Sequence, residues 1–206
     1  MSTNFALFLA SAVVIALIPG PSIFYVAART LAAGRNEGLA STLGMSIGGL
    51  VHILAGAFGV SALIMASAEA FTLMKLAGAA YLIWLGIKTF CSARIEAPQH
   101  VEVTGAARAF RQGIVVEITN PKTASYFLAF LPQFIDVSQP VALQFMILGV
   151  ISVVLNGLVD LVVVVMAGAA REGLDKRPDV VARIRQGSGL IMAGLGASLL
   201  VARRAN

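Results

Sequence analysis

The chain has 206 residues, of which 58% are hydrophobic and 12% are charged, and its formal net charge is +5. A soluble domain has about a quarter charged residues, so this composition predicts a membrane protein. The single cysteine, Cys91, excludes an intramolecular disulfide and a paired-thiol redox site. The sequence contains no Gly-rich Lys-Ser/Thr loop for phosphate binding, so any transport must be that of a secondary carrier or a channel.

Six apolar segments follow one another, and each is long enough to cross a hydrocarbon core, which takes about 20 residues. They run approximately over residues 4–28, 38–66, 70–91, 111–135, 141–170 and 186–202. The first segment has no charged residue before Arg29. A signal peptide needs a basic region before its apolar core, so we expect a retained helix.

Basic residues are concentrated in every second connector, which predicts how the chain is oriented. Cytoplasmic connectors carry an excess of Lys and Arg, so the bias predicts an inner-membrane, multi-pass protein with both termini outside. Arg203 and Arg204 oppose this assignment, and a re-entrant first or last segment would change it. Eleven of the 15 basic residues lie on the predicted cytoplasmic side: Arg29, Arg35, Lys88, Arg94, Arg108, Arg111, Arg171, Lys176, Arg177, Arg183 and Arg185.

The first and fourth segments are each interrupted by a proline motif, Pro19-Gly20-Pro21 and Asn120-Pro121-Lys122. Proline lacks an N–H and clashes with the carbonyl four residues earlier. We therefore expect free carbonyls at Ile15, Leu17 and Glu117. Asn120 is suited to cap the half-helix that starts at Pro121.

The two interruptions divide the chain into matching halves of three segments each. An odd number of spans per half reverses the direction of the second half, which is typical of secondary transporters. The predicted fold is an all-α membrane protein with six transmembrane helices, arranged as a 3+3 inverted repeat with broken helices 1 and 4. One transporter domain would cover residues 1–206, with repeats at about 1–91 and 111–206 and a loop at 92–110.

An unwound turn is tolerated in a membrane only where protein or a wet cavity surrounds it. Half-helix N-termini offer N–H donors to a carboxylate, and free carbonyls accept from an ammonium group. These breaks predict a binding site for a small zwitterion, although a kink repaired by neighbouring helices is the structural alternative. We expect the fourth span to set the carboxylate end and the first to supply a flexible wall. The predicted substrate-binding residues are Pro19, Gly20, Pro21, Asn120, Pro121, Lys122 and Asp160.

Three ionisable residues, Glu117, Lys122 and Asp160, fall inside predicted spans. Each costs about 2.5–3.5 kcal/mol or more at mid-bilayer if unpaired, so we expect Lys122 to pair with Asp160 or Glu117. The pair is either structural or part of a substrate or proton site. Asp160 is the best candidate for an ammonium contact or a proton carrier, whereas Glu117 is close enough to the end of its span to sit at the interface. Asn156 lies one turn before Asp160 and is an additional candidate.

Small residues recur every four positions on two segments, which allows close helix packing in lipid. Packing within the chain is the simpler interpretation, and a homodimer through these Gly/Ala-rich faces is the other. His52 lies on the first stripe and is interpreted as a packing or hydrogen-bonding residue, with a site role as an additional hypothesis. The stripes are Gly44, Gly48, His52 and Gly56, and Gly189, Ala193 and Ala197.

The ordered set of motifs resembles the lysine exporter (LysE) family, in particular its homoserine/threonine exporter branch. The motifs are Ile18-Pro19-Gly20-Pro21, the glycine pattern of 44–59, residues 78–88, Phe110-Arg111-Gln112-Gly113, Asn120-Pro121-Lys122 and Phe130-Leu131-Pro132-Gln133-Phe134. This resemblance spans essentially the whole chain. It implies a six-helix inner-membrane exporter of small amino acids or close derivatives, driven by the proton gradient.

Two other function classes are open to such a chain. Efflux of a metal or another inorganic cation needs clustered ligands, but His52, Glu117 and Asp160 are scattered along the sequence. An intramembrane enzyme needs a nucleophile with a paired histidine, or two cysteines, and neither pattern is present. We therefore expect no enzyme activity, no bound cofactor or metal and no nucleic-acid partner, only an amino-acid substrate and the lipid bilayer.

Overall fold

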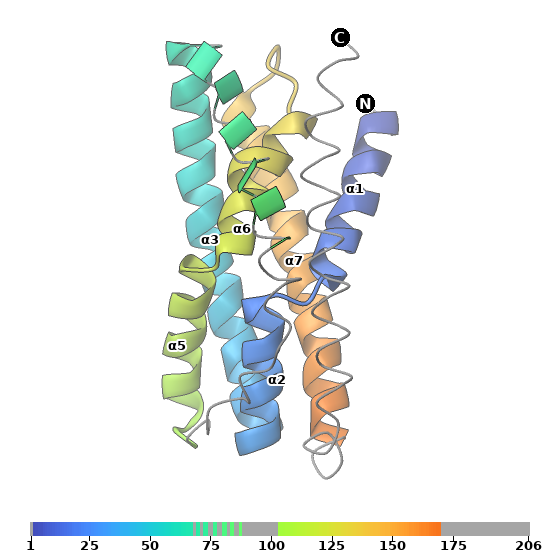
Figure 1. Cartoon of the computed structure of the whole chain (residues 1–206), viewed down its shortest axis with the longest axis vertical. Coiled ribbons are helices and arrows are strands. Elements are labelled where there is room, and N and C mark those ends of the chain that lie inside the picture. The colour runs from blue at the N-terminus through green and yellow to red at the C-terminus, as the bar shows by residue number, and fades with distance from the viewer. Residues whose placement is uncertain are drawn as a thin grey trace.

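In a computed structural model, the protein is a bundle of long helices that run side by side (Figure 1). The structure describes residues 2–67, separate residues between 69 and 87, and residues 103–169. These ranges contain helices and turns but no strand, so the predicted all-helical fold is confirmed there. The elements are α1 (Ser2–Leu17), α2 (Pro21–Ala33), α3 (Arg35–Ala66), α5 (Ala106–Ile118), α6 (Pro121–Ser125), a π-helical turn η1 (Tyr126–Phe130), a 3₁₀ turn η2 (Leu131–Phe134) and α7 (Val141–Ala169).

The first break separates α1 from α2 at the predicted position. The helix ends at Leu17 because two prolines remove N–H donors within three residues. Gly20 is extended, and Pro21 occupies the first position of α2, where its missing N–H costs nothing. The two halves meet at an angle of 46°.

The junction between α2 and α3 differs from the prediction. A connector was expected over residues 29–37, but α2 continues to Ala33 and only Gly34, with φ 89°, separates it from α3. This positive φ favours glycine because it lacks a Cβ. The helices extend through the charged residues because Arg29 and Glu37 form a buried ion pair with each other.

The second break separates α5 from α6, also at the predicted position. Asn120 caps α6 as expected, since its Oδ1 accepts a hydrogen bond from the Lys122 N–H at 3.0 Å. The helix then widens into η1 and tightens into η2. Pro132 accounts for this irregularity, because it cannot donate to the carbonyl of Leu128 and its ring displaces that carbonyl.

Two described helices are long and apolar enough to cross a membrane, α3 over Arg35–Leu63 and α7 over Val141–Ala169. The bent pair Phe5–Leu17 and Pro21–Ala33 makes a third if it is counted as one span. The predicted segment 141–170 agrees with α7. The predicted segment 70–91 is described only in part, and residues 186–202, with the second small-residue stripe, lie outside the described residues.

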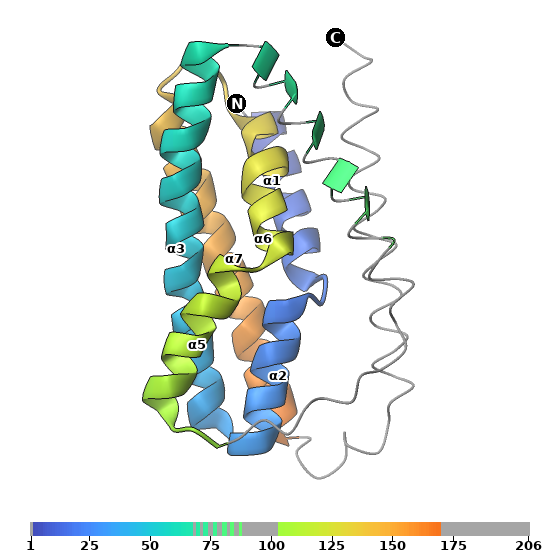
Figure 2. The same cartoon turned by 60° about the vertical axis from the view of Figure 1, so that its left-hand side comes forward.

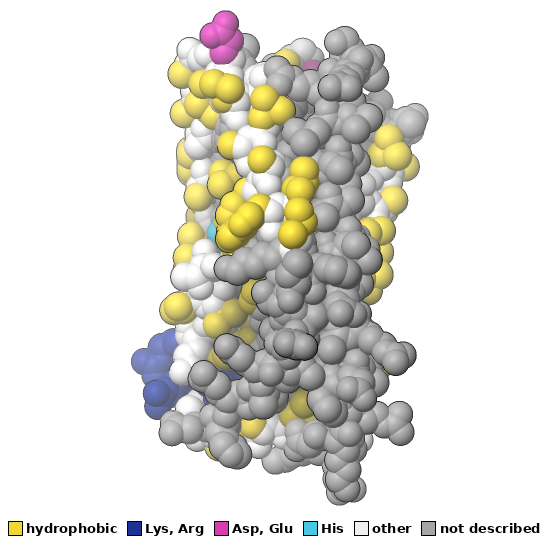
Figure 3. Space-filling view, viewed as in Figure 1, with side chains coloured by type: hydrophobic (Ala, Val, Ile, Leu, Met, Phe, Trp, Pro, Cys, Tyr) yellow, Lys and Arg dark blue, Asp and Glu magenta, His cyan; other side chains and the backbone are white. Residues whose placement is uncertain are grey.

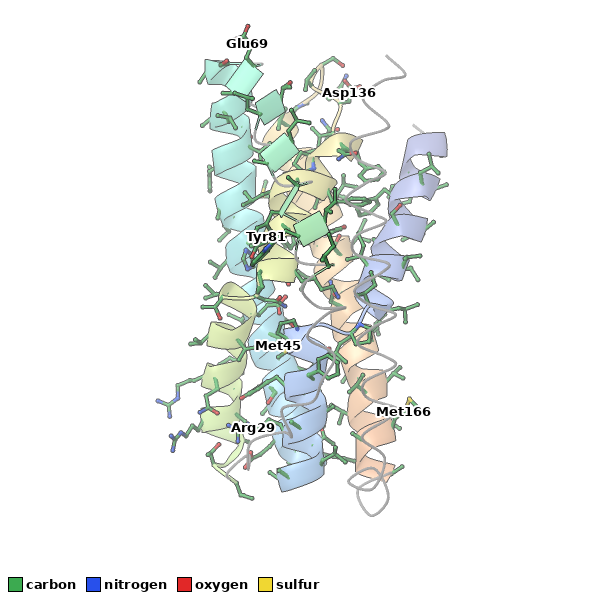
Figure 4. All side chains as sticks on the ribbon, viewed as in Figure 1. Arg29, Met45, Glu69, Tyr81, Asp136 and Met166 are labelled. Carbon is green, nitrogen blue, oxygen red and sulfur yellow. The ribbon has the colours of Figure 1, made fainter. Side chains whose placement is uncertain are left out.

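The two broken helices cross the bundle in opposite directions. In Figures 1 and 2, α1 and α2 descend from the upper end, whereas α5 and α6 rise from the lower end. Both breaks therefore lie near mid-height. Loop residue Asp136 marks the upper end and Arg29 the lower end (Figure 4).

Apolar side chains form two buried clusters at different heights. The upper cluster joins α1, α3, η1 and α7 through residues such as Ile15, Ile53, Phe127 and Phe145. The lower cluster consists of Val26, Met45 and Val164. The polar site described below lies between them, because Phe127 and Met45 both line it.

The small-residue stripe of α3 is used for packing inside the chain. A Cβ on Gly44 would lie 2.0 Å from the Phe110 carbonyl oxygen, and one on Gly56 would lie 2.2 Å from the Phe145 ring. Any larger residue would therefore push α5 or α7 away from α3. Packing, the simpler interpretation of this stripe, is what the structure contains, and a homodimer stays a prediction.

Exposed basic and exposed acidic side chains of the described residues lie at opposite ends of the molecule. Basic side chains gather at the lower end in Figure 3, over the start of α5, where Arg108 and Arg111 are exposed. Glu69 and Asp136 lie at the opposite end (Figure 4). Asp136 accepts hydrogen bonds from the Oγ and N–H of Ser138, which lower the pKa of its carboxyl group.

Candidate functional site

Lys122 connects the two breaks directly. Its Nζ donates a hydrogen bond to the carbonyl oxygen of Ile18 at 2.6 Å, and the residue is only 8% exposed. Ile18 lies in the first break and Lys122 just after the second. Gly20 permits this approach, because a Cβ at that position would lie 2.9 Å from Lys122 Cδ.

Glu117 is the centre of a hydrogen-bond network that also spans both breaks. Its carboxylate accepts from Ser22 Oγ at 2.5 Å, Thr123 Oγ1 at 2.8 Å and Asn120 Nδ2 at 3.2 Å. Asn120 Nδ2 also donates to Ser22 Oγ at 2.5 Å. The expectation that Glu117 could lie at the membrane interface was wrong, because these donors from α2 and α6 hold it in the buried interior.

His52 completes the backbone repair at the second break. Its Nε2 lies 3.0 Å from the carbonyl oxygen of Glu117, the carbonyl that Pro121 was predicted to free. The Asn120 N–H donates to the same oxygen at 3.1 Å. The imidazole stacks on Phe127 with ring centroids 5.8 Å apart. The interpretation of His52 as a packing and hydrogen-bonding residue is confirmed.

The predicted carbonyl contacts at the first break need correction. The Ile15 carbonyl accepts from the Ile18 N–H at 3.2 Å, so a tightened last turn satisfies it. The carbonyl that receives the lysine is that of Ile18, which was not predicted. Its usual helical donor, the Ser22 N–H, has no partner among the described residues.

A polar cavity of about 20 Å³ lies between the breaks, α3 and α7. A space of this size holds about one water molecule. Met45, one of its lining residues, lies close to mid-height of the bundle (Figure 4). The polar side chains that line the cavity are Ser22, Glu117, Asn120, Lys122 and Thr123 on one side, and Ser46, Asn156 and Asp160 on the other.

Asp160 faces this cavity from α7 and is 5% exposed. It has no hydrogen-bond or ion-pair partner among the described residues. The predicted ion pair of Lys122 with Asp160 or Glu117 is wrong for this conformation, since neither carboxylate lies within 4.0 Å of Nζ. The lysine ammonium binds a backbone carbonyl instead, and its charge is balanced across the cavity rather than through contact.

The sequence-predicted residues separate into two groups in the structure. Gly20, Asn120, Lys122 and Asp160 line the cavity, together with the additional candidates Glu117 and Asn156. Three prolines and His52 shape the breaks without being part of the lining: Pro19, Pro21, Pro121 and His52.

Sequence reasoning missed three polar residues and one glycine of the lining. Ser22 and Thr123 follow the two proline motifs directly, so their proximity to the breaks was a usable signal. Ser46 lies among the glycines of α3 and Gly157 beside Asn156 on α7. Nothing in a single sequence distinguishes these two from residues that only pack.

A second buried polar cluster lies below the site, around the ion pair of Arg29 and Glu37 at 3.1 Å. The guanidinium also donates to Tyr25 OH, Thr104 Oγ1 and Gln112 Oε1. Glu37 Oε1 accepts from the N–H groups of Thr104 and Gly105 at 3.0 and 2.6 Å. The cluster therefore ties α2, α3, α5 and the segment before α5 together at the basic end of the molecule.

The described residues contain no group of three or more His, Cys, Asp or Glu side chains that could hold a metal ion. The charged groups of the cavity are one lysine and two carboxylates, separated across a narrow space. Opposite charges from different helices therefore face the same small cavity.

Comparison with known proteins places the chain in a family. No solved structure matches it. It is 32% identical to the homoserine/homoserine lactone efflux protein of Salmonella typhimurium, over 96% of both chains. An uncharacterized membrane protein of Vibrio cholerae is 32% identical over 95% of this chain and 96% of that protein. The leucine efflux protein of Klebsiella pneumoniae is 31% identical over 66% of this chain and 65% of that protein.

A family model described as LysE type translocator matches residues 13–203. The match includes both breaks, the cavity residues and the charged cluster at the basic end. Together with the long apolar helices, it shows that the chain belongs to the LysE type translocator family of membrane proteins.

Proposed function

We propose that this protein exports small amino acids or close derivatives from the cytoplasm as a proton-driven secondary transporter of the inner membrane. The observation that carries the proposal is the buried cavity where Lys122 and Asp160 face the same small space from different helices. A zwitterion needs both charges. The names of the homoserine and leucine efflux relatives support the same substrate class.

We assign the substrate carboxylate to Lys122 and the start of α2. The first N–H group of α6 belongs to Lys122, and it already donates to Asn120 Oδ1. At α2 the N–H groups of Ser22 and Ile23 have no partner among the described residues, and both residues line the cavity. A helix start with free N–H groups favours an anion, and Lys122 adds a full positive charge beside it.

We assign the substrate ammonium to Asp160, which is also the candidate proton carrier. It is the buried carboxylate without a partner in the described part of the chain. Glu117 is less available, because three side chains donate to it. A proton or an ammonium group would neutralise Asp160, so binding of one would exclude the other.

Export requires the site to open, because a cavity for about one water cannot hold an amino acid. The opposite directions of the broken helices support a 3+3 inverted repeat of six spans, with one domain over the whole chain. Alternating access would then come from movement of one repeat against the other.

Two substitutions test the assignment in cells and in proteoliposomes. Lys122→Met and Asp160→Asn each keep most of the side-chain volume and remove the charge. We expect export of homoserine or threonine to fall at least about tenfold in either variant, since a hydrogen bond to a charged group is worth about 1.5–3 kcal/mol. Gly59→Ala is the matched control, because open space surrounds that position on α3.

Wild-type rates in both charge variants would contradict the site assignment. The cation alternative is tested with the same strains, by comparing growth on inhibitory amino acids with growth on metal salts. Protection against metal salts alone would contradict amino-acid export. Proton coupling predicts that an imposed pH gradient accelerates transport by the wild-type protein.

A further inference from the structure

The α3 and α7 wall of the cavity has two uncharged polar side chains, Ser46 and Asn156, beside Asp160 and among the apolar residues Met45 and Val153. Ser46 Oγ donates to the Thr42 carbonyl at 3.0 Å, and Asn156 Nδ2 donates to the Ser152 carbonyl at 2.9 Å. These bonds use the serine hydrogen and one amide hydrogen. The Ser46 oxygen and Asn156 Oδ1 keep their lone pairs, so this wall offers hydrogen-bond acceptors to the cavity.

Gly157 leaves a space opposite Ser46. A Cβ at Gly157 would lie 3.5 Å from Ser46 Oγ, an ordinary contact, and would meet no other atom within 4 Å. The other two glycines of the described lining differ, because a Cβ would lie 2.9 Å from Lys122 Cδ at Gly20 and 2.7 Å from Val153 Cγ2 at Gly49. Gly157 is thus the lining glycine where an added methyl group fits without displacing a neighbour.

We propose that Ser46, Asn156 and Gly157 form the subsite for the substrate side chain and select a short side chain that ends in a hydroxyl group. This inference rests on the proposed function. Asn156 and Gly157 precede Asp160 by four and three residues, so they lie on the same face of α7 about one turn, or 5.4 Å, away. An ammonium group at Asp160 places the substrate side chain beside them.

The chemistry of the wall decides between polar and apolar side chains. A substrate hydroxyl donates to Ser46 Oγ or Asn156 Oδ1, whereas an apolar side chain of the same size covers these acceptors without pairing them. A site built to bind a hydroxyl rejects the analogue that lacks it. We expect a preference of at least about tenfold for homoserine over 2-aminobutyrate, which differs from it by only the terminal hydroxyl.

Competition between substrates in proteoliposomes tests the subsite, because a ratio of rates does not depend on how much protein is folded. The wild-type protein should prefer homoserine over 2-aminobutyrate, and Asn156→Leu and Ser46→Ala should each reduce that preference at least about threefold. Gly157→Ala should lower the ratio of homoserine to serine export at least about threefold, because the methyl group shortens the subsite. Gly59→Ala should leave both ratios unchanged.

Two results would overturn the inference, and they differ from a failure of the proposed function. One is wild-type export of 2-aminobutyrate as fast as homoserine. The other is unchanged ratios in all three subsite variants. If the wild-type protein exported no amino acid at all, the proposed function itself would be refuted, and the subsite with it.

Discussion

Gly20 lies against the aliphatic part of Lys122, and its lack of a side chain lets the lysine reach Ile18. Gly20→Ala would place a methyl group 2.9 Å from Lys122 Cδ. Overpacking of this kind costs about 1–3 kcal/mol, and the lysine can avoid it only by moving. We expect export to fall at least about tenfold, measured as efflux from preloaded cells.

Gly59→Ala again serves as the control for this substitution, since it adds the same methyl group at a position on α3 where no neighbouring atom lies within 4 Å. Full activity of Gly20→Ala with an unchanged melting temperature in detergent would mean that the position of Lys122 is not critical.

The residues of the site differed in how far the sequence revealed them. Asn120, Lys122 and Asp160 were recognisable, because a cap before a proline and a charge inside an apolar segment each have few explanations. Ser46 was not recognisable, since its place in the cavity depends on the rotation of α3 about its axis. The partner of Lys122 was mispredicted for a related reason: a broken helix also supplies bare carbonyls, which compete with carboxylates for an ammonium group.

At the scale of elements, the ion pair of Arg29 and Glu37 joins α2 to α3, and the hydrogen bond from Arg29 to Gln112 adds α5. Removal of one partner of a buried ion pair costs about 3–5 kcal/mol, because the other charge stays buried. We expect Arg29→Gln to lower the free energy of unfolding in detergent by an amount in this range. The double variant Arg29→Gln/Glu37→Gln should lose less than the sum of the two single variants.

Arg111→Gln is the control for this series, because Arg111 is exposed on α5 and its Nε binds only a carbonyl of its own helix. It should change stability by less than about 0.5 kcal/mol. Additive effects of Arg29→Gln and Glu37→Gln would show that the two side chains do not act as a pair.

This cluster also explains why the first connector was mispredicted. Charged residues at 29, 35 and 37 were taken to mark a solvated loop, because isolated charges are costly in an apolar helix. Pairing between Arg29 and Glu37 removes most of that cost, so the helices continue and a single glycine makes the turn. Composition predicts where a span becomes polar, but the partners of the polar groups decide where the helix ends.

At the scale of the whole molecule, the charge distribution predicts the orientation in the membrane. A Cys91→Ser background permits single cysteines at Arg108, at the basic end, and at Ser138, at the opposite end. We expect a membrane-impermeant thiol reagent to label the Ser138→Cys variant in intact cells and the Arg108→Cys variant only in inverted vesicles. The reverse pattern would contradict the positive-inside assignment and the direction of export.

The sequence predicted the two breaks and their matching positions, because proline and glycine act locally on the backbone. It did not predict the separation of two apolar clusters by a polar layer, because only tertiary packing brings Phe127 and Met45 to the same cavity. The span count rests on apolar length alone, and the described helices provide two or three of the six predicted spans.

The hydrogen bond from Lys122 to the Ile18 carbonyl has a thermodynamic consequence. In the proposed mechanism these groups belong to different repeats, so a substrate carboxylate and the Ile18 carbonyl compete for the same ammonium group. The Ile18 carbonyl is therefore an internal competitor of the substrate carboxylate. By reciprocity, substrate affinity is higher with the repeats separated than with them together by the same factor by which bound substrate favours that separation.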